Sequence, residues 1–202
     1  MKAAPKSVIR RPAASKPPGE VRIIGGLWKR TKLPVAVLPG LRPTPDRVRE
    51  TLFNWLGQDL SGWRCIDVFA GTGALGFEAA SRGAASVLLC EQAVALLEPL
   101  KALATKLQAT AVTVARGDGL AQLRRQAPAS LDLVFIDPPF ESELYLPALQ
   151  AASEALASNG FIYLEAPRSW TDEELVPLRL QLHRTGKAGM VHFHLLKKAA
   201  EA

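Results

Sequence analysis

The residues best suited to chemistry are four in a row, Asp137-Pro138-Pro139-Phe140. They follow residues 131–136, a run of branched and aromatic residues that predicts a buried strand, so they lie just past its carboxyl end. In open α/β sheets, ligands bind at that edge. Proline has no N–H but keeps its carbonyl, and Pro139 restricts Pro138 to extended backbone. The pattern therefore predicts a stiff loop that offers hydrogen-bond acceptors without competing donors.

Two acceptors held close together suit an exocyclic amino group. The Asp137 carboxylate and the Pro138 carbonyl could accept its two N–H bonds and leave its lone pair directed at an electrophile. Phe140 could stack on the base that carries the amine. The alternative is an ordinary turn, in which Asp137 caps a backbone N–H and Phe140 belongs to the core. The four residues alone leave both interpretations open.

Length and composition indicate a single domain with small appendages. A chain of 202 residues, 48% of them hydrophobic, can bury a sizeable core. No apolar run approaches the roughly 18 residues that span a bilayer, and the N-terminus lacks the apolar segment of a secretory signal. We therefore expect a cytoplasmic protein without a membrane partner. Cys65, Cys90 and three scattered histidines match no metal-ligand spacing, so we expect reduced core cysteines and no metal.

Positive charge is concentrated near the N-terminus. Residues 1–49 contain twelve Lys and Arg against Glu20 and Asp46, a balance of +10, whereas the whole chain carries +6. Such segregation predicts a polyanionic partner, and nucleic acid fits best. Residues 1–20 have almost no large apolar side chain, so we predict a disordered basic tail, for which simple solvation is the alternative.

A small extension over residues 21–43 follows the tail. Apolar and basic residues alternate around Gly25-Gly26, which predicts a β-hairpin. Its basic side chains could contact phosphates, and Trp28 could stack on a base or pack in the core. The candidate RNA-binding residues of this part of the chain are Arg22, Trp28, Lys29, Arg30, Lys32, Arg42 and Arg47.

From residue 44 to residue 202 the pattern predicts one α/β domain. Its first helix begins with Thr44 as N-cap and Pro45 at the first helical position. Strands are predicted at residues 65–69, 86–90, 111–115, 131–136 and 160–165. Helices follow the first two strands, ending near Gly83 and spanning 93–107 with an interruption at Pro99, and a third spans 143–157 before Asn159-Gly160. Residues 178–182 and 190–196 predict an antiparallel edge pair, separated by a turn over residues 184–189.

A glycine-rich loop follows the first strand of this domain. Its glycines, at positions 71, 73 and 76, allow a ligand to approach the backbone, and the helix that it opens offers free N–H donors. Glu91 ends the second strand, where such folds hold ribose hydroxyls. Asp118, after the third strand, could accept from an adenine amino group or serve as a turn or cap residue.

These motifs resemble those of class I S-adenosylmethionine-dependent methyltransferases. Residues 67–73 resemble the first motif of that class, and Asp137 to Phe140 resemble its amino-group methylating motif. The resemblance implies a Rossmann-like α/β fold, with a seven-stranded, mostly parallel sheet and an antiparallel C-terminal edge pair. The cofactor-binding residues that it implies are Asp67, Phe69, Ala70, Gly71, Thr72, Gly73, Ala74, Glu91, Gln92, Asp118 and Gly119. The catalytic residues that it implies are Asp137, Pro138, Pro139 and Phe140.

Further segments resemble one family within this class, the bacterial RsmD family, over about residues 21–196. They are residues 22–26, 41–44, 46–56 and 186–189. The resemblance implies methyl transfer from S-adenosylmethionine to N2 of a guanine in small-subunit ribosomal RNA. The guanine would be extruded from its stack to reach the methyl group. The implied partner is that RNA or a partly assembled 30S particle, and the implied enzyme is a monomer.

Other functions fit parts of the sequence. An enzyme that methylates an adenine or cytosine amino group in DNA or another RNA would use the same Asp137 loop, but it normally has a larger base-reading domain. An NAD-dependent oxidoreductase would explain the glycine loop and Glu91 and leave the Asp137 loop without a role. A non-catalytic RNA-binding protein on the same scaffold would not bind the cofactor.

Overall fold

The computed structural model describes residues 21–35, 38 and 43–199. Its central element is a seven-stranded sheet with the strand order β5-β4-β3-β6-β7-β9-β8. The pairs among β3 to β7 are parallel, and β9 pairs antiparallel with both β7 and β8. The strands are β3 (Arg64–Asp67), β4 (Ser86–Glu91), β5 (Val112–Arg116), β6 (Leu131–Ile136), β7 (Leu156–Ala166), β8 (Leu180–Ala188) and β9 (Val191–Lys198). The predicted fold class is confirmed.

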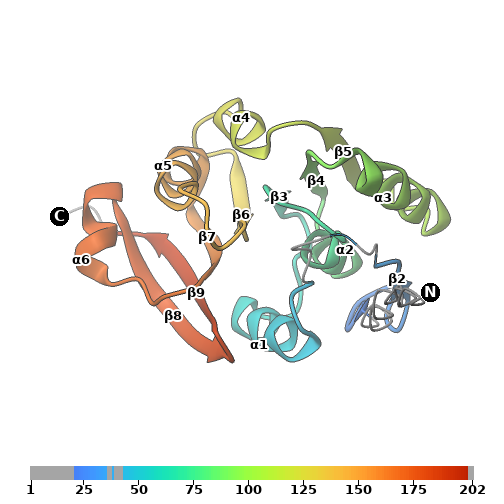
Figure 1. Ribbon diagram of the computed structural model, residues 1–202, viewed down its shortest axis with the longest axis horizontal. Coiled ribbons are helices and arrows are strands. Elements are labelled where there is room, and N and C mark those ends of the chain that lie inside the picture. Colours follow the sequence, from blue (N-terminus) through green and yellow to red (C-terminus); the bar gives the residue numbers. More distant parts are fainter. Residues whose placement is uncertain (1–20, 36–37, 39–42, 200–202) are drawn as a thin grey trace, which may run out of the picture.

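Helices cover both faces of the sheet, because successive strand residues point to opposite sides (Figure 1). Cys65, Leu133 and Phe135 face one hydrophobic cluster, whereas Ile66 and Val134 face the other. The first face is covered by α1 (Asp46–Leu56), α2 (Ala74–Ser81) and α3 (Val94–Lys106). The second is covered by α4 (Gly119–Arg124), α5 (Tyr145–Ala155) and α6 (Asp172–Leu175). A short 3-10 helix, η1 (Val176–Leu178), precedes β8.

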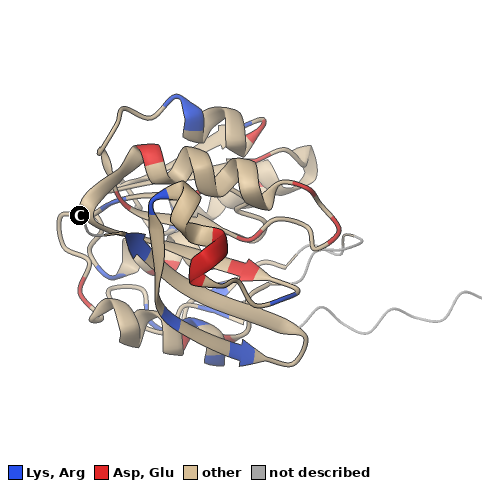
Figure 2. Cartoon of the chain, turned by 90° about the vertical axis from the view of Figure 1, so that its left-hand side faces the viewer, with Lys and Arg blue, Asp and Glu red and all other residues tan. Residues whose placement is uncertain are grey.

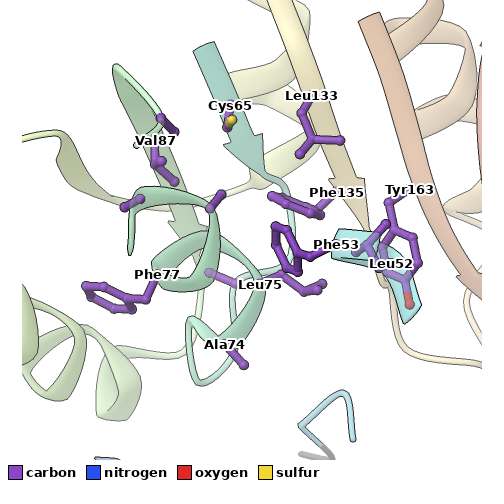
Figure 3. Close-up of a cluster of buried hydrophobic side chains, with 14 of the residues drawn as sticks. Leu52, Phe53, Cys65, Ala74, Leu75, Phe77, Val87, Leu133, Phe135 and Tyr163 are labelled. Carbon is purple, nitrogen blue, oxygen red and sulfur yellow. The ribbon is translucent and has the colours of Figure 1, made fainter. Parts of the chain in front are cut away.

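The first face holds the larger aromatic side chains. Figure 3 shows Phe53 of α1 between the α2 side chains and Phe135 of β6, with Tyr163 of β7 beside them. The Phe53 and Phe135 ring centroids are 6.4 Å apart, and those of Phe135 and Tyr163 are 6.3 Å apart. All three side chains are buried. This packing fixes α1 against the sheet beneath the ends of β6 and β7.

The N-terminal extension is hydrogen-bonded to Glu78, a buried acid of α2. Its strands β1 (Val21–Arg22) and β2 (Lys32–Leu33) pair antiparallel. The backbone N–H groups of Ile24 and Gly25 donate to the two Glu78 carboxylate oxygens at 2.7 and 2.8 Å. Buried Arg49 of α1 and Arg82 pair with the same carboxylate at 3.2 and 2.8 Å. The extension, α1 and α2 therefore meet at the buried Glu78 carboxylate.

Two predicted boundaries in the second half of the domain are wrong. The helix predicted to reach residue 157 ends at Ala155, and Asn159-Gly160 lie inside β7. A Cβ on Gly160 would stand 3.0 Å from the Leu131 carbonyl oxygen, where the β6–β7 register shifts. Gly160 therefore serves a close approach between strands and is not a helix cap.

The C-terminal pair is also longer than predicted. β8 continues to Ala188, so most of the predicted turn over residues 184–189 is strand. A Cβ on Gly186 would stand 2.3 Å from the Phe193 ring, so this glycine makes room for an aromatic side chain. The chain turns at Gly189, which has a φ of 60°.

Two helix predictions are wrong, and one helix was not predicted. Pro99 lies inside a continuous α3 and does not interrupt it. The short helix α4 was not predicted, because six residues give too little periodicity to read. Thr44 does not cap α1: the N-cap is Pro45, without a side-chain hydrogen bond, and the Thr44 side chain bonds Glu165 instead.

Candidate active site

The candidate site lies at the carboxyl edge of the parallel strands. β3 and β6 are neighbours, although β4 and β5 intervene in the sequence, so the chain reverses its winding direction between them. Such a switch point is where open α/β sheets bind ligands. The loops after β3 and β6 leave this edge side by side, and the Val68 N–H donates to the Phe135 carbonyl at 3.1 Å. The glycine loop and the Asp137 loop are therefore adjacent.

The glycine loop turns sharply into α2. Gly71 and Gly73 have φ values of 53° and 75°, in the left-handed region that other residues avoid. The Gly73 N–H donates to the Ala70 carbonyl at 2.6 Å, and a Cβ on Gly73 would stand 2.7 Å from the Phe77 ring. The loop is thus held tightly, with the N–H groups of the first α2 turn at the edge. Thr72 and Ala74 are buried in this turn, and Phe69 is half-buried before it.

Glu91, at the end of β4, holds the glycine loop in place. One carboxylate oxygen accepts from the Gly71 N–H at 2.8 Å and the other from the Ala93 N–H at 2.7 Å. A carboxylate has about four acceptor sites, so Glu91 keeps acceptor capacity beyond these two bonds. Gln92 is exposed beside it.

Asp118 lies at the next strand end and caps α4. Its side chain accepts from the Leu120 N–H at 2.9 Å, which is the cap role considered from the sequence. Among the described residues, no donor bonds the second oxygen of this exposed carboxylate. Gly119 packs closely under the site, since a Cβ there would stand 1.9 Å from the Val68 carbonyl oxygen.

Asp67 supports the glycine loop from below. Its buried carboxylate accepts from the Gly76 N–H at 3.2 Å. Burial raises the pKa of Asp67 to about 7, with smaller contributions from the negative charges of Glu91 and Glu165 and an opposing effect of backbone hydrogen bonds.

The Asp137 loop differs from an ordinary turn. Among the described residues, no N–H donates to the Asp137 carboxylate or to the Pro138 carbonyl, so Asp137 does not cap the loop. The Pro139 carbonyl accepts from the Ser142 N–H at 2.9 Å, which closes the turn. Phe140 is 37% exposed and is not part of the core. The loop therefore presents two unused acceptors and an accessible ring.

Asp137 belongs to a cluster of acids that sequence reasoning missed. Burial and the charges of Glu165 and Asp67 raise its pKa well above the usual value. Glu165, buried at the end of β7, accepts from the Tyr163 hydroxyl at 2.8 Å. Burial also raises the pKa of Glu165, although hydrogen bonds from Thr44 and Tyr163 oppose this. The available signal was an acid that ends an otherwise apolar strand.

The buried acids make the free energy of unfolding depend on pH. An acid with a higher pKa in the folded chain binds more protons when folded, so a rise in pH destabilises the fold. For Asp67 the window runs from its ordinary value of 3.8 to about 7. We expect urea unfolding of the ligand-free protein to show a stability that falls as the pH rises from about 4 to about 7. Asp67→Asn, which keeps an acceptor for Gly76, should flatten this slope, and an unchanged slope would contradict the assignment.

A cavity of about 260 Å³ lies beside the acid cluster, between the start of α5 and the chain after β7. Tyr145, Ala166 and Trp170 line it, together with Arg168, whose guanidinium lies 4.7 Å from the Trp170 ring centroid. Burial and the charges of Asp137 and Glu165 raise the pKa of Tyr145 to about 12. The cavity thus adjoins the half of the edge formed by β6 and β7.

The candidate RNA-binding residues do not gather at this edge. Arg47 is exposed in the first turn of α1. Trp28 lies near the far end of α2, where its backbone N–H donates to the Ser81 hydroxyl at 2.9 Å. The Trp28 side chain is half-buried. Since α2 has eight residues, that point is about 12 Å from the glycine loop. Lys29 and Arg30 are exposed near Trp28, and Arg22 and Lys32 are exposed on the β1–β2 pair. Arg42 and the predicted tail of residues 1–20 lie outside the described residues.

The part of the chain that the structure describes contains no group of three or more His, Cys, Asp or Glu that could hold a metal ion. Cys65 and Cys90 are buried and unpaired. None of the described helices has the length and apolar character to cross a membrane.

Comparisons with known proteins agree with this geometry. The family described as "Conserved hypothetical protein 95" matches residues 21–197. The "Ribosomal RNA small subunit methyltransferase D" of Escherichia coli K12 is 42% identical over 190 residues, covering 91% of this chain and 92% of the relative. The protein of that name from Haemophilus influenzae is 42% identical over 168 residues, covering 76% and 86%. The solved structure of "Putative methyltransferase yhhF from Escherichia coli" has a TM-score of 0.77 and 40% identity, covering 91% of this chain and all of that one.

Proposed function

We propose that this chain, which belongs to the Conserved hypothetical protein 95 family, is a ribosomal RNA methyltransferase. Its relatives include proteins named "Ribosomal RNA small subunit methyltransferase D". Its reaction transfers a methyl group from S-adenosylmethionine to N2 of a guanine in small-subunit ribosomal RNA. The observation that carries the proposal is the Asp137 loop. Its carboxylate and the Pro138 carbonyl have no donor among the described residues, and both stand next to the glycine loop at the switch point.

The residues of the edge suit S-adenosylmethionine. The left-handed glycines leave no side chain between the loop backbone and a ligand, and acids end two neighbouring strands. We assign Gly71 and Gly73 to its amino-acid part, Glu91 to its ribose and Asp118 to its adenine. The flanking positions of the same loops complete the set: Asp67, Phe69, Ala70, Thr72, Ala74, Gln92 and Gly119. When bound, this cofactor supplies a methyl group on a positively charged sulfur.

The Asp137 loop holds and deprotonates the amine. The guanine leaves its stack, and Phe140 stacks on the extruded base. Asp137 and the Pro138 carbonyl accept the two N2 hydrogens, and the stiff Pro138-Pro139 backbone keeps the nitrogen lone pair directed at the methyl carbon. After methyl transfer the substituted nitrogen would carry one proton too many, and the Asp137 carboxylate would accept it. The raised pKa of Asp137 suits this final step.

The remaining parts of the proposal concern the partner and the division of the chain. Residues 44–202 form the methyltransferase domain, and residues 21–43 form an extension that contacts RNA through its basic side chains. The substrate is small-subunit ribosomal RNA, free or in a partly assembled particle, and the enzyme acts as a monomer in the cytoplasm. Relatives that carry the ribosomal RNA methyltransferase name support this substrate class.

Labelled S-adenosylmethionine tests the proposal directly. The protein is incubated with unmodified small-subunit particles, with protein-free ribosomal RNA and with DNA, and the label is then mapped. We expect label on N2 of one guanine in RNA and none in DNA. Label on an adenine amino group would establish the competing amino-group methyltransferase. Calorimetric titration separates the other two alternatives, because an oxidoreductase binds NAD and a non-catalytic scaffold does not bind S-adenosylmethionine.

A further inference from the structure

The turn between β8 and β9 stands at the same edge as the candidate site. β7 ends at Ala166, which pairs with His192 of β9. Lys187 pairs with the same His192 and so stands level with the end of β7, and the β8–β9 pair continues past this point with Ala188 opposite Val191. Since β7 runs parallel to β6, the end of β7 and the Asp137 loop share one edge. The tip of the β8–β9 pair, residues 187–190, therefore projects beyond the sheet on the side of the acid cluster and the cavity.

Every Lys, Arg, Asp or Glu position of this strand pair is a Lys or an Arg. Residues 180–198 contain four Lys and Arg, three His and no acidic residue. Figure 2 shows lysine and arginine along the two strands, with acidic residues confined to neighbouring elements. At the tip, Lys187 is exposed and Met190 is 81% exposed. Arg168 adds a second cation at this edge, although Glu174 pairs with it at 2.8 Å. The overall count conceals this charge, because residues 50–202 together carry more acids than bases.

The tip is held firmly in place. The Phe193 ring packs against the backbone of Gly186, where a Cβ would stand 2.3 Å away. On its other side the same ring stacks on Trp55 of α1, with ring centroids 5.3 Å apart. α1 also packs on β6, since the ring centroids of Phe53 and Phe135 are 6.4 Å apart, and β6 leads into the Asp137 loop. The tip and the Asp137 loop are therefore braced by the same helix.

We propose that residues 187–190 form an RNA contact beside the Asp137 loop, distinct from the N-terminal extension. Lys187 pairs with a backbone phosphate next to the extruded guanine, and Met190 packs against the base that extrusion leaves unstacked. A polyanion is the partner that an acid-free strand pair attracts, and phosphate contacts fix the register of a nucleic acid. Apolar side chains such as Met are used elsewhere to fill gaps between unstacked bases. This inference rests on the proposed function.

Two lysines on the same strand pair provide a matched test. Lys187 lies at the tip, and Lys197 lies at the other end of the pair, opposite Phe161 and Gln181. RNA affinity of the full chain is measured over a range of salt concentrations for Lys187→Ala, Lys197→Ala and Lys187→Arg. Each lost phosphate contact lowers the salt slope by about 0.7 to 0.9, which corresponds to about five- to eightfold weaker binding near 0.1 M salt. We expect this loss for Lys187→Ala only, with wild-type behaviour for the other two.

Met190 is tested against Val176, a 66% exposed apolar residue in η1. The substrate is an RNA helix with fluorescent 2-aminopurine next to the target guanine, because its emission rises when it is unstacked. We expect Met190→Ala to change this signal and to slow methylation of the helix, but not of a short single strand. Val176→Ala should match the wild type in all three measurements.

The outcomes separate this inference from the proposed function. Equal salt slopes for Lys187→Ala and Lys197→Ala, in a protein that methylates RNA, would overturn the tip contact alone. Equal behaviour of Met190→Ala and Val176→Ala would remove the apolar part of it. A wild-type protein that binds S-adenosylmethionine but methylates no RNA would instead overturn the proposed function.

Discussion

Replacing Asp137 by alanine is expected to abolish methyl transfer and to leave the affinity for S-adenosylmethionine within a few-fold of the wild type. Asp137 would lose both of its roles, as an acceptor that orients the amine and as the base that takes its proton. A positioned acid–base group alone contributes about 10²- to 10⁴-fold, and orientation adds to that. Single-turnover methylation of small-subunit RNA measures the first effect, and calorimetry measures cofactor affinity.

Two variants sharpen this prediction. Asp137→Asn keeps an acceptor of the same size but cannot take a proton, so we expect it to retain more activity than alanine and less than the wild type. Asp132→Ala is the matched control, because Asp132 lies in β6, the strand that ends just before Asp137, but pairs with Arg64 on the surface at 2.9 Å. It should methylate like the wild type. If Asp137→Ala also lost cofactor binding, Asp137 would be a structural residue of the edge.

The sequence predicted best those parts of the candidate site that consist of a few consecutive residues. The glycine loop, Glu91 and the Asp137 loop are each a few consecutive residues at a strand end, and periodicity located all of those strands. The structure adds that Glu91 holds the Gly71 N–H and that Asp137 accepts no N–H from the described residues. Neither fact can be read from spacing, because each depends on the orientation of a side chain in a folded loop.

Contacts between distant parts of the chain were the main omission. Thr44 has the sequence context of a helix cap, yet its side chain reaches Glu165 of β7. Glu78 lies in a helix of small residues and reads as an exposed position, yet it accepts N–H groups from residues more than fifty positions away. Two glycines were also assigned wrongly from the sequence. Gly160 and Gly186 were predicted in a helix end and a turn, but they lie in strands, where they make room for neighbouring atoms. A pattern in one sequence records a residue's neighbours along the chain and not its partners across it.

Glu78→Ala should cost about 3–5 kcal/mol of the free energy of unfolding, the usual effect of removing one partner from a buried ion pair. The variant leaves the guanidinium groups of Arg49 and Arg82 buried without their shared carboxylate. It also removes the acceptor for the N–H groups of Ile24 and Gly25. The hydrogen bonds between residues 25–28 and Ser81 remain, so the extension should loosen at its Ile24 end before the domain unfolds. Urea unfolding measures the global effect, and limited proteolysis near residue 25 measures the local one.

Glu98→Ala is the control for this variant. Glu98 also pairs with a cation, Lys101 at 3.1 Å, but its side chain is 81% exposed, and exposed pairs contribute little. We expect its stability to stay close to that of the wild type. A Glu78→Ala protein as stable as Glu98→Ala would show that the buried carboxylate does not organise the extension. If the expected loss is found, RNA affinity should fall while cofactor affinity persists, because the Glu78 carboxylate bonds the basic extension and two arginines and, among the described residues, accepts no hydrogen bond from the glycine loop.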